Sequence, residues 1–155
     1  MTVRVGINGF GRIGRNFFRA VAARNADIEI VAVNDLGSLK TMAHLLKYDS
    51  VLGVLPQTIS AVEGGISIDG KILKVVSERD PKSLPWGSLG VDLVIESTGI
   101  FTDRDKAATH LEAGAPMVIV SAPSPPVYVW PAAIAVPNVT AAELVLVITA
   151  AAAKL

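Results

Sequence analysis

Three closely spaced glycines near the start of the chain are the feature that most restricts its fold. Residues 9–14 read Gly-Phe-Gly-Arg-Ile-Gly. The residues before them, 3–8, are rich in β-branched side chains, which is typical of a strand. After them, apolar residues recur with helical spacing up to residue 23. The sequence therefore predicts a strand, a tight glycine turn and a helix in direct succession.

A second strand and a carboxylate extend this pattern into a β-α-β unit. The nearly all-apolar segment 28–33 predicts the strand, and Asp35 follows it. In such a unit Gly9 permits the turn, Gly11 lets the backbone approach a pyrophosphate, and Gly14 allows close packing of helix on strand. The first helical N–H groups face the phosphates. The pattern predicts an adenine-dinucleotide site.

Asp35 favours one class of dinucleotide. A carboxylate here can bond ribose hydroxyls and would repel a 2′-phosphate, so NAD is favoured over NADP. The arginines Arg12 and Arg15 could neutralise phosphate charge, although a solvated helix face explains either of them without any ligand. The alternative is that the glycines only shape a turn and Asp35 caps the next helix.

The segments beyond Asp35 predict the rest of the fold. We expect a helix at 38–48, a hairpin at 66–75 around an Asp-Gly pair, a strand at 91–96, a helix at 103–112 and a strand at 117–120. Strands alternating with helices indicate a mostly parallel sheet covered on both faces. The expected fold class is α/β, a doubly wound Rossmann sheet with an antiparallel hairpin insertion.

Composition excludes several classes of function. The chain has 155 residues, 51% of them hydrophobic, and its 14 basic side chains balance 14 acidic ones. This argues against disorder and against an electrostatic nucleic-acid or membrane binder. Cysteine is absent, so no thiolate can act as nucleophile or metal ligand, and we expect neither catalytic residues nor a metal site. The two histidines, His44 and His110, have no evident catalytic partner in the sequence.

The composition changes after residue 122. Residues 123–155 contain only two charged side chains, and five prolines between 123 and 137 disfavour a regular helix or a central strand there. The apolar run 144–148 favours a strand, with a helix as the alternative because Thr140 begins a capping-box spacing. We expect residues 1–149 to form one six-stranded dinucleotide-binding domain and 150–155 a tail.

Six motifs in order across residues 1–124 resemble a known family. They are Val-Gly-Ile-Asn-Gly-Phe-Gly-Arg-Ile-Gly-Arg from Val5, Val-Asn-Asp-Leu from Val33, His-Leu-Leu-Lys-Tyr-Asp from His44, Ser-Glu-Arg-Asp-Pro from Ser77, Glu-Ser-Thr-Gly-Ile-Phe from Glu96 and Val-Ser-Ala-Pro-Ser from Val120. They resemble the N-terminal nucleotide-binding domain of NAD-dependent phosphorylating glyceraldehyde-3-phosphate dehydrogenase. The resemblance implies a cytoplasmic glycolytic tetramer that binds NAD and oxidises glyceraldehyde 3-phosphate. Residues 125–149 diverge from the family pattern.

The resemblance also implies a set of cofactor-binding residues. Those expected on the pyrophosphate and adenosine side are Asn8, Gly9, Phe10, Gly11, Arg12, Ile13 and Gly14, with Asp35 on the adenine ribose and Arg79 beside the adenine. Those expected toward the nicotinamide half are Ser97, Thr98, Gly99, Phe101 and Ser121.

The chain departs from the family where catalysis is concerned. The family attacks the aldehyde with a cysteine that a histidine of a second domain activates, and neither this cysteine nor a catalytic domain is present in the 155 residues. We therefore expect the chain alone to be inert. The alternative is a free-standing, non-catalytic module that binds NAD or adenine nucleotides. RNA binding is disfavoured because the charge is balanced.

Overall fold

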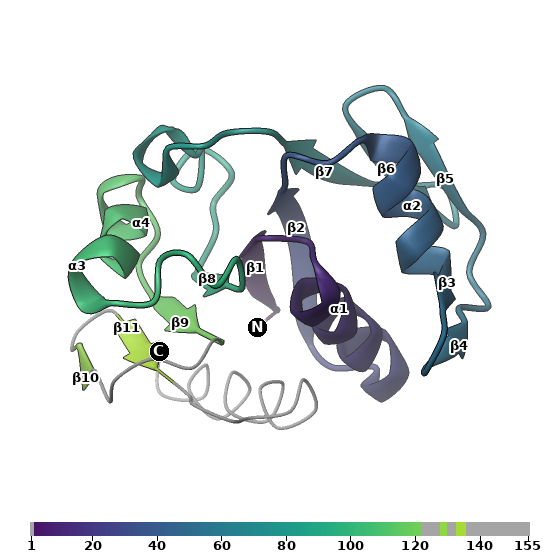
Figure 1. The fold of residues 1–155 in the computed structure, drawn as a ribbon, viewed down its shortest axis with the longest axis horizontal. Helices are drawn as coiled ribbons and strands as arrows, with labels where there is room; N and C mark the ends of the chain where they lie inside the picture. Colours follow the sequence, from purple (N-terminus) through teal and green to yellow (C-terminus); the bar gives the residue numbers. More distant parts are fainter. Residues whose placement is uncertain (1, 122–127, 130–132, 136–155) are drawn as a thin grey trace.

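A computed structural model of the chain describes residues 2–121, 128–129 and 133–135 (Figure 1). The helices are α1 (Arg12–Arg24), α2 (Leu39–Lys47), α3 (Arg104–Ala107) and α4 (Thr109–Glu112), and Pro81–Ser83 forms a 3-10 turn. The strands are β1 (Val3–Asn8), β2 (Ile28–Asn34), β3 (Tyr48–Asp49), β4 (Gly53–Val54), β5 (Ile59–Val62), β6 (Gly65–Ile68), β7 (Lys71–Val76), β8 (Leu93–Glu96), β9 (Val118–Val120), β10 (Tyr128–Val129) and β11 (Ala133–Ala135).

Strand β1 lies inside a nine-stranded sheet with the order β10-β11-β9-β8-β1-β2-β7-β6-β5. It pairs in parallel with β2 on one side and with β8 on the other. The chain runs outward from β1 through β2 to β7, and then returns to β8 and continues outward through β9 to β11, still in parallel. The predicted doubly wound sheet is confirmed, but the expected six strands are wrong, because the hairpin strands and the strands of the proline-rich segment extend the described sheet to nine. Its strand order reverses between β1 and β8, where this architecture forms ligand crevices.

The predicted hairpin is confirmed at one end of the sheet (Figure 1). Strands β6 and β7 pair antiparallel around Asp69 and Gly70. Both turn residues have positive φ, 49° and 86°, which is the backbone of a type I′ turn and explains the Asp-Gly pair. Strand β5 adds a third antiparallel strand, and β3 with β4 forms a separate small sheet. These short strands were not predicted because they lack a clear alternation.

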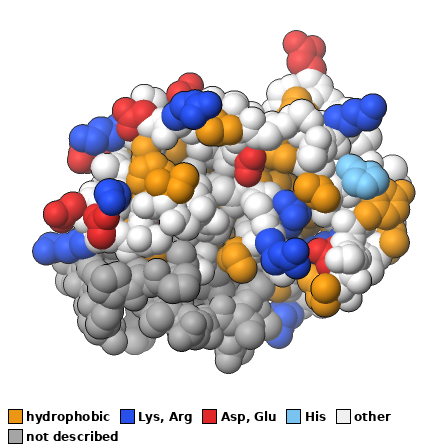
Figure 2. All heavy atoms as spheres, viewed as in Figure 1, with side chains coloured by type: hydrophobic (Ala, Val, Ile, Leu, Met, Phe, Trp, Pro, Cys, Tyr) orange, Lys and Arg blue, Asp and Glu red, His pale blue; other side chains and the backbone are white. Residues whose placement is uncertain are grey.

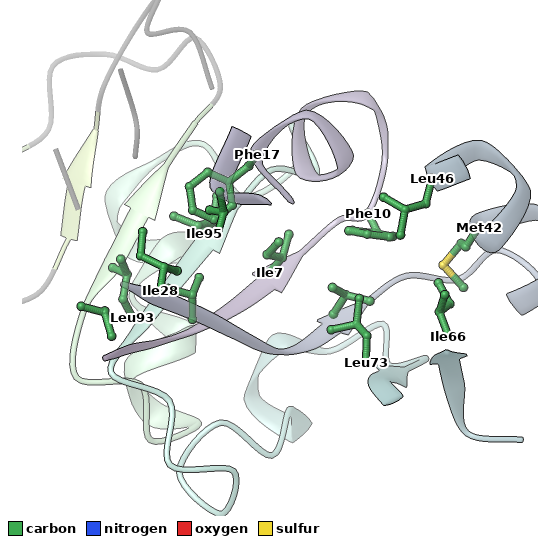
Figure 3. Packing of buried hydrophobic residues seen from close by; sticks show 14 of the residues in the cluster. Ile7, Phe10, Phe17, Ile28, Met42, Leu46, Ile66, Leu73, Leu93 and Ile95 are labelled. Atoms are coloured by element: carbon green, nitrogen blue, oxygen red, sulfur yellow. The ribbon is translucent and has the colours of Figure 1, made fainter. Parts of the chain in front are cut away.

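Two hydrophobic clusters hold the fold together. The first contains alternate residues of the central strands, such as Ile7 and Ile95, with Phe10, Phe17 and Leu46 around them (Figure 3). The second cluster includes Trp86, Val94, Ala107 and Val118. Ala107 belongs to α3 and Trp86 to the segment before β8, so these two parts of the chain cover the face of the sheet that α1 does not. Residues 93 and 95 belong to the first cluster and residue 94 to the second. This is the alternation of a strand that is buried on both faces.

Gly6 of β1 lies directly against the ring of Trp86. A Cβ atom added at Gly6 would lie 2.7 Å from the indole, which is itself fully buried. Glycine is therefore required at this position by close approach rather than by backbone conformation.

Some element boundaries differ from the sequence predictions. The expected helix at 103–112 is two short helices, which a turn at Ala108 separates. Beside this turn, the Thr109 hydroxyl donates to the carbonyl of Lys106 (2.5 Å). Strands β10 and β11 occupy the proline-rich segment, at one edge of the sheet, and β11 contains no proline. The strand expected at 144–148 lies outside the described residues. In the part of the chain that the structure describes, no helix has the length and apolar character needed to cross a membrane.

Candidate functional site

A cleft of about 430 Å³ lies where β1, β2 and β8 end at the same edge of the sheet. Its lining residues are Asn8, Gly9, Gly11, Asn34, Asp35, Leu36, Glu78, Arg79, Ser97, Thr98, Ile100 and Phe101. A second hollow of about 340 Å³ lies between α2 and β5 and contains none of the predicted site residues. The cleft at the strand ends is therefore the candidate site.

The structure brings most of the predicted site residues to this cleft. Those that line it are Asn8, Gly9, Gly11, Asp35, Arg79, Ser97, Thr98 and Phe101. Those outside its lining are Phe10, Arg12, Ile13, Gly14, Gly99 and Ser121. Sequence reasoning from the motifs missed Asn34, Leu36, Glu78 and Ile100, which also line it.

Two of the three clustered glycines are required by the chain itself. Gly9 has a φ of 91°, and a Cβ there would lie 2.7 Å from the amide nitrogen of Thr98. A Cβ on Gly14 would lie 2.3 Å from the carbonyl oxygen of Gly9, so this glycine permits α1 to approach the turn. Both observations agree with the roles predicted from the spacing.

Gly11 differs from its two neighbours because the chain does not require a glycine there. Its φ of −72° is accessible to any residue, and a Cβ added to it would meet no atom of the described residues within 4 Å. Since neither packing nor backbone conformation explains this glycine, the space beside it is available to a molecule outside the chain. The alternative hypothesis, in which the glycines only shape a turn, does not explain why residue 11 is a glycine.

The first turn of α1 is suited to an anion. Its N-cap is Gly11, which offers no side-chain oxygen, and no acidic residue lies in the first turn. The first N–H groups of a helix have no partner within the helix, and they carry the positive end of its dipole. Arg12 and Ile13 are exposed on this turn, with 43% of Ile13 accessible. A phosphate group placed here would meet backbone donors and a basic side chain.

Asp35 joins the glycine turn to the end of β2. Its Oδ2 atom accepts a hydrogen bond from the Phe10 N–H (2.8 Å), and its Oδ1 atom accepts one from Gly37 N–H (2.8 Å). Each carboxylate oxygen can accept a second bond, so the group keeps capacity for hydroxyl donors. The helix that follows is capped by Ser38, whose hydroxyl accepts from Thr41 N–H (3.1 Å). The expected alternative, in which Asp35 caps this helix, is therefore not the observed arrangement.

Arg15 points inward rather than along a solvated helix face. Its guanidinium donates to the carbonyl of Phe10 (2.9 Å), and the residue is half-buried. Burial lowers the pKa of Arg15, while the nearby carboxylates of Asp49 and Asp35 partly offset this effect. This hydrogen bond ties the side chain to the backbone of the glycine turn.

The remaining predicted residues contribute mainly through the backbone or through structure. The Phe10 side chain is 1% exposed and belongs to the first hydrophobic cluster, so only its backbone faces Asp35. Ser97 donates from its hydroxyl to the carbonyls of Gly9 (2.6 Å) and Asn8 (3.1 Å). The Ser121 hydroxyl donates to the carbonyl of Glu96 (3.1 Å).

Two of the cleft residues that sequence reasoning missed are apolar and exposed. Leu36 is 53% exposed and Ile100 68% exposed, and Phe101, which also lines the cleft, is half-buried. Apolar side chains that remain accessible in a cleft offer contact surface for flat rings. Leu36 directly follows Asp35 and Ile100 lies just after β8, so proximity to a strand end was the signal that could have identified them.

His110 lies in different surroundings from those the sequence suggested. It is fully buried, and its Nε2 atom lies 2.9 Å from Oε2 of Glu96, a partner that the sequence did not reveal. His44, in contrast, is exposed on α2. Neither histidine lines the cleft. Among the described residues, no cluster of acidic or histidine side chains could hold a metal ion.

Comparison with known proteins identifies relatives of this chain. A family model described as glyceraldehyde 3-phosphate dehydrogenase, NAD binding domain, matches residues 3–104. Glyceraldehyde-3-phosphate dehydrogenase 1 of Streptomyces arenae is 63% identical over 124 residues, and glyceraldehyde-3-phosphate dehydrogenase of Geobacillus stearothermophilus is 60% identical over 124 residues. Each match covers 80% of this chain and 37% of the relative. The chain thus spans a little over a third of the length of these curated relatives.

We expect Gly11→Ser to separate binding from stability. Serine is a good N-cap, and within the described part of the chain its Cβ meets no atom, so the free energy of unfolding in urea should change by less than about 0.5 kcal/mol. The side chain projects into the space beside the α1 N-terminus, so NAD affinity measured by calorimetry should fall about tenfold or more, as steric overlap predicts.

Gly14→Ala provides the contrast, because its Cβ collides with the Gly9 carbonyl and should destabilise the fold by about 1–3 kcal/mol. Unchanged NAD affinity in Gly11→Ser would contradict our interpretation of the cleft.

Proposed function

This chain belongs to the glyceraldehyde 3-phosphate dehydrogenase family by its NAD-binding domain, and on that premise we propose that NAD lies in the cleft with its pyrophosphate over Gly11 and the first turn of α1. The open space at Gly11 supports this proposal, because no residue that the structure describes fills it or requires a glycine beside it. The uncapped helix start supplies donors for the phosphates.

The adenosine half of NAD is proposed to lie toward β2. Asp35 keeps acceptor capacity for the ribose hydroxyls, and the exposed Arg79 follows β7 on the same side of the cleft. The accessible side chain of Leu36 offers apolar contact for the adenine ring.

The nicotinamide half is proposed to lie toward β8. Ser97, Thr98 and Phe101 line this part of the cleft, and Gly99 has a φ of 75° in the turn between them. Ser121 lies at the end of β9, next in the sheet to β8. NAD supplies a hydride acceptor when bound, whereas the residues of this chain bind it and orient it.

We further propose that the domain serves oxidation and phosphorylation of glyceraldehyde 3-phosphate in a full-length cytoplasmic enzyme, as the family resemblance implies. The 155 residues contain no cysteine, so they offer no thiol to form a covalent intermediate with an aldehyde. The second candidate is a module that binds NAD or adenine nucleotides without chemistry, since these residues supply a binding cleft and no thiol.

The cofactor preference tests the proposed role of Asp35. The chain should bind NAD at least about tenfold more tightly than NADP, because the carboxylate repels a 2′-phosphate. Asp35→Asn removes that charge and sets an amide NH₂ against one of the two backbone N–H partners of Asp35. Because the lost hydrogen bond weakens the binding of both cofactors alike, their affinities should come within about threefold of each other. Calorimetric titration measures both.

Asp69→Asn, at the tip of the β6–β7 hairpin and far from the cleft, is the matched control and should keep the preference. Equal binding of NAD and NADP by the unaltered chain would be inconsistent with the proposed position of Asp35.

Catalysis distinguishes the two candidate functions. With NAD, phosphate and glyceraldehyde 3-phosphate, the 155-residue chain alone should produce no NADH, because it lacks a thiol nucleophile. Absorbance at the NADH band measures this. Activity that appears after a catalytic polypeptide of a relative is added would support the enzymatic role. NAD binding without any such activity would support the free-standing module.

We also propose that the chain self-associates, in line with the tetramer of the family. Large apolar side chains are exposed on the small β3–β4 sheet, where Tyr48, Val51, Leu52 and Val54 are 50% to 78% accessible. Figure 2 shows hydrophobic side chains on the side of the molecule where β3, β4 and β5 lie. Such patches promote association. Light scattering should show a mass above 16.2 kDa that rises with concentration. A constant mass near 16.2 kDa would count against it.

A further inference from the structure

A row of three polar side chains crosses the sheet beneath the cleft. The parallel register places Asn34 of β2 beside Asn8 of β1, and Asn8 beside Glu96 of β8. All three are nearly inaccessible, with exposures of 5%, 2% and 1%. Asn34 donates to Asn8 Oδ1 (2.7 Å), and Asn8 donates to Glu96 Oε2 (2.5 Å). Buried polar groups of this kind are costly unless each has a partner.

Glu96 is the centre of this row. Its Oε1 accepts from both the N–H (2.8 Å) and the hydroxyl of Thr98, and its Oε2 accepts from Asn8 and from His110 Nε2 (2.9 Å). Each of these groups acts as a donor toward the carboxylate. An ionised carboxylate has only acceptors, so it suits this position.

The direction of the hydrogen bonds is fixed at the His110 end. The indole N–H of Trp86 lies 3.1 Å from His110 Nδ1, and an indole nitrogen can only donate. His110 must therefore accept at Nδ1 and carry its proton at Nε2, which faces Glu96. The neutral histidine thus has one defined tautomer.

The direction is also fixed at the Asn34 end. The Asn34 side chain accepts from the N–H of Glu78 (2.8 Å) and donates to the carbonyl of Glu78 (2.9 Å). Because backbone groups cannot exchange these roles, the amides of Asn34 and then Asn8 have one orientation each. Glu78 precedes Arg79, so this end of the row supports the β2 side of the cleft.

We infer that Glu96 is a positioning residue of the cofactor cleft, whose buried carboxylate holds the Thr98 turn on one wall and, through Asn8 and Asn34, the Glu78 segment on the other. The inference rests on the proposed function and extends it. Glu96 does not line the cleft itself. Glu96 acts by holding the donor groups of Asn8 and Thr98, which do line the cleft.

An amide at position 96 cannot satisfy the same partners. If its NH₂ replaced Oε2, it would face both the Asn8 amide and the His110 N–H, whose directions are fixed. If it replaced Oε1, it would face one fixed donor, Thr98 N–H, and a hydroxyl that can rotate to accept. In the second placement the new NH₂ faces one fixed donor instead of two, so this placement is favoured. Glu96→Gln therefore acts mainly on the Thr98 turn, on the proposed nicotinamide side.

The test compares NAD with AMP as probes. Glu96→Gln should raise the Kd of NAD about tenfold and that of AMP by less than about threefold, because AMP does not reach the Thr98 wall. A general loss of stability would lower the folded fraction equally for both probes and leave the ratio of the two Kd values unchanged.

Asp92→Asn is the matched control, because Asp92 also accepts a backbone bond, from Arg4 N–H (2.9 Å), but at the opposite end of β8. Its Kd values should equal those of the unaltered chain. An unchanged ratio in Glu96→Gln, with normal NAD binding by the unaltered chain, would overturn the inference alone. No NAD binding by the unaltered chain would overturn the proposed function as well.

A measurement on the unaltered chain does not depend on whether the variant folds. Nitrogen-15 NMR should show His110 protonated at Nε2 only, whereas the exposed His44 should show averaged tautomers. Saturating NAD should shift the His110 Nε2 signal through Thr98 and Glu96 and leave that of His44 in place. A proton on Nδ1 of His110, or a His110 signal that NAD does not move, would overturn the inference.

Discussion

The parallel pairing of β1 with β2 and β8 is the constraint on which the rest of the structure depends. Strand β1 has a neighbour on each side and a hydrophobic cluster on each face. A one-residue shift of its register would turn its buried side chains to the opposite face, so the register is fixed. Its carboxyl end is also where the glycine turn begins and the cleft opens. The binding geometry is therefore a direct extension of the central strand.

The fold could be predicted from the sequence because local and long-range signals agree in it. Apolar runs without a polar face indicated buried parallel strands, and the Asp-Gly pair located the β6–β7 turn, whose two residues have positive φ. The division of 103–112 into two helices could not be foreseen, because the turn at Ala108 that separates them has no glycine or proline to signal it. Short strands such as β3 and β4 have too few residues to show a period.

The candidate site was predictable only in part. The spacing of Gly9, Gly11 and Asp35 follows from backbone requirements near a phosphate, so these positions could be named from sequence. Glu96 could not, since the sequence shows it only as a charge that ends an apolar strand. Its partners lie 14 and 88 residues away, at His110 and Asn8. Only the register of the folded sheet brings them together.

Burial of the row beneath the cleft has a consequence for hydrogen exchange. The indole proton of Trp86 and the Nε2 proton of His110 are enclosed in fully buried side chains. Gly6 leaves no space between β1 and the indole through which water could pass. These protons reach solvent when a segment that covers them, such as α4 or the segment before β8, separates from the sheet. The exchange rates of these two protons therefore report how often this half of the domain opens. Such opening is far slower than the motion of the exposed turns.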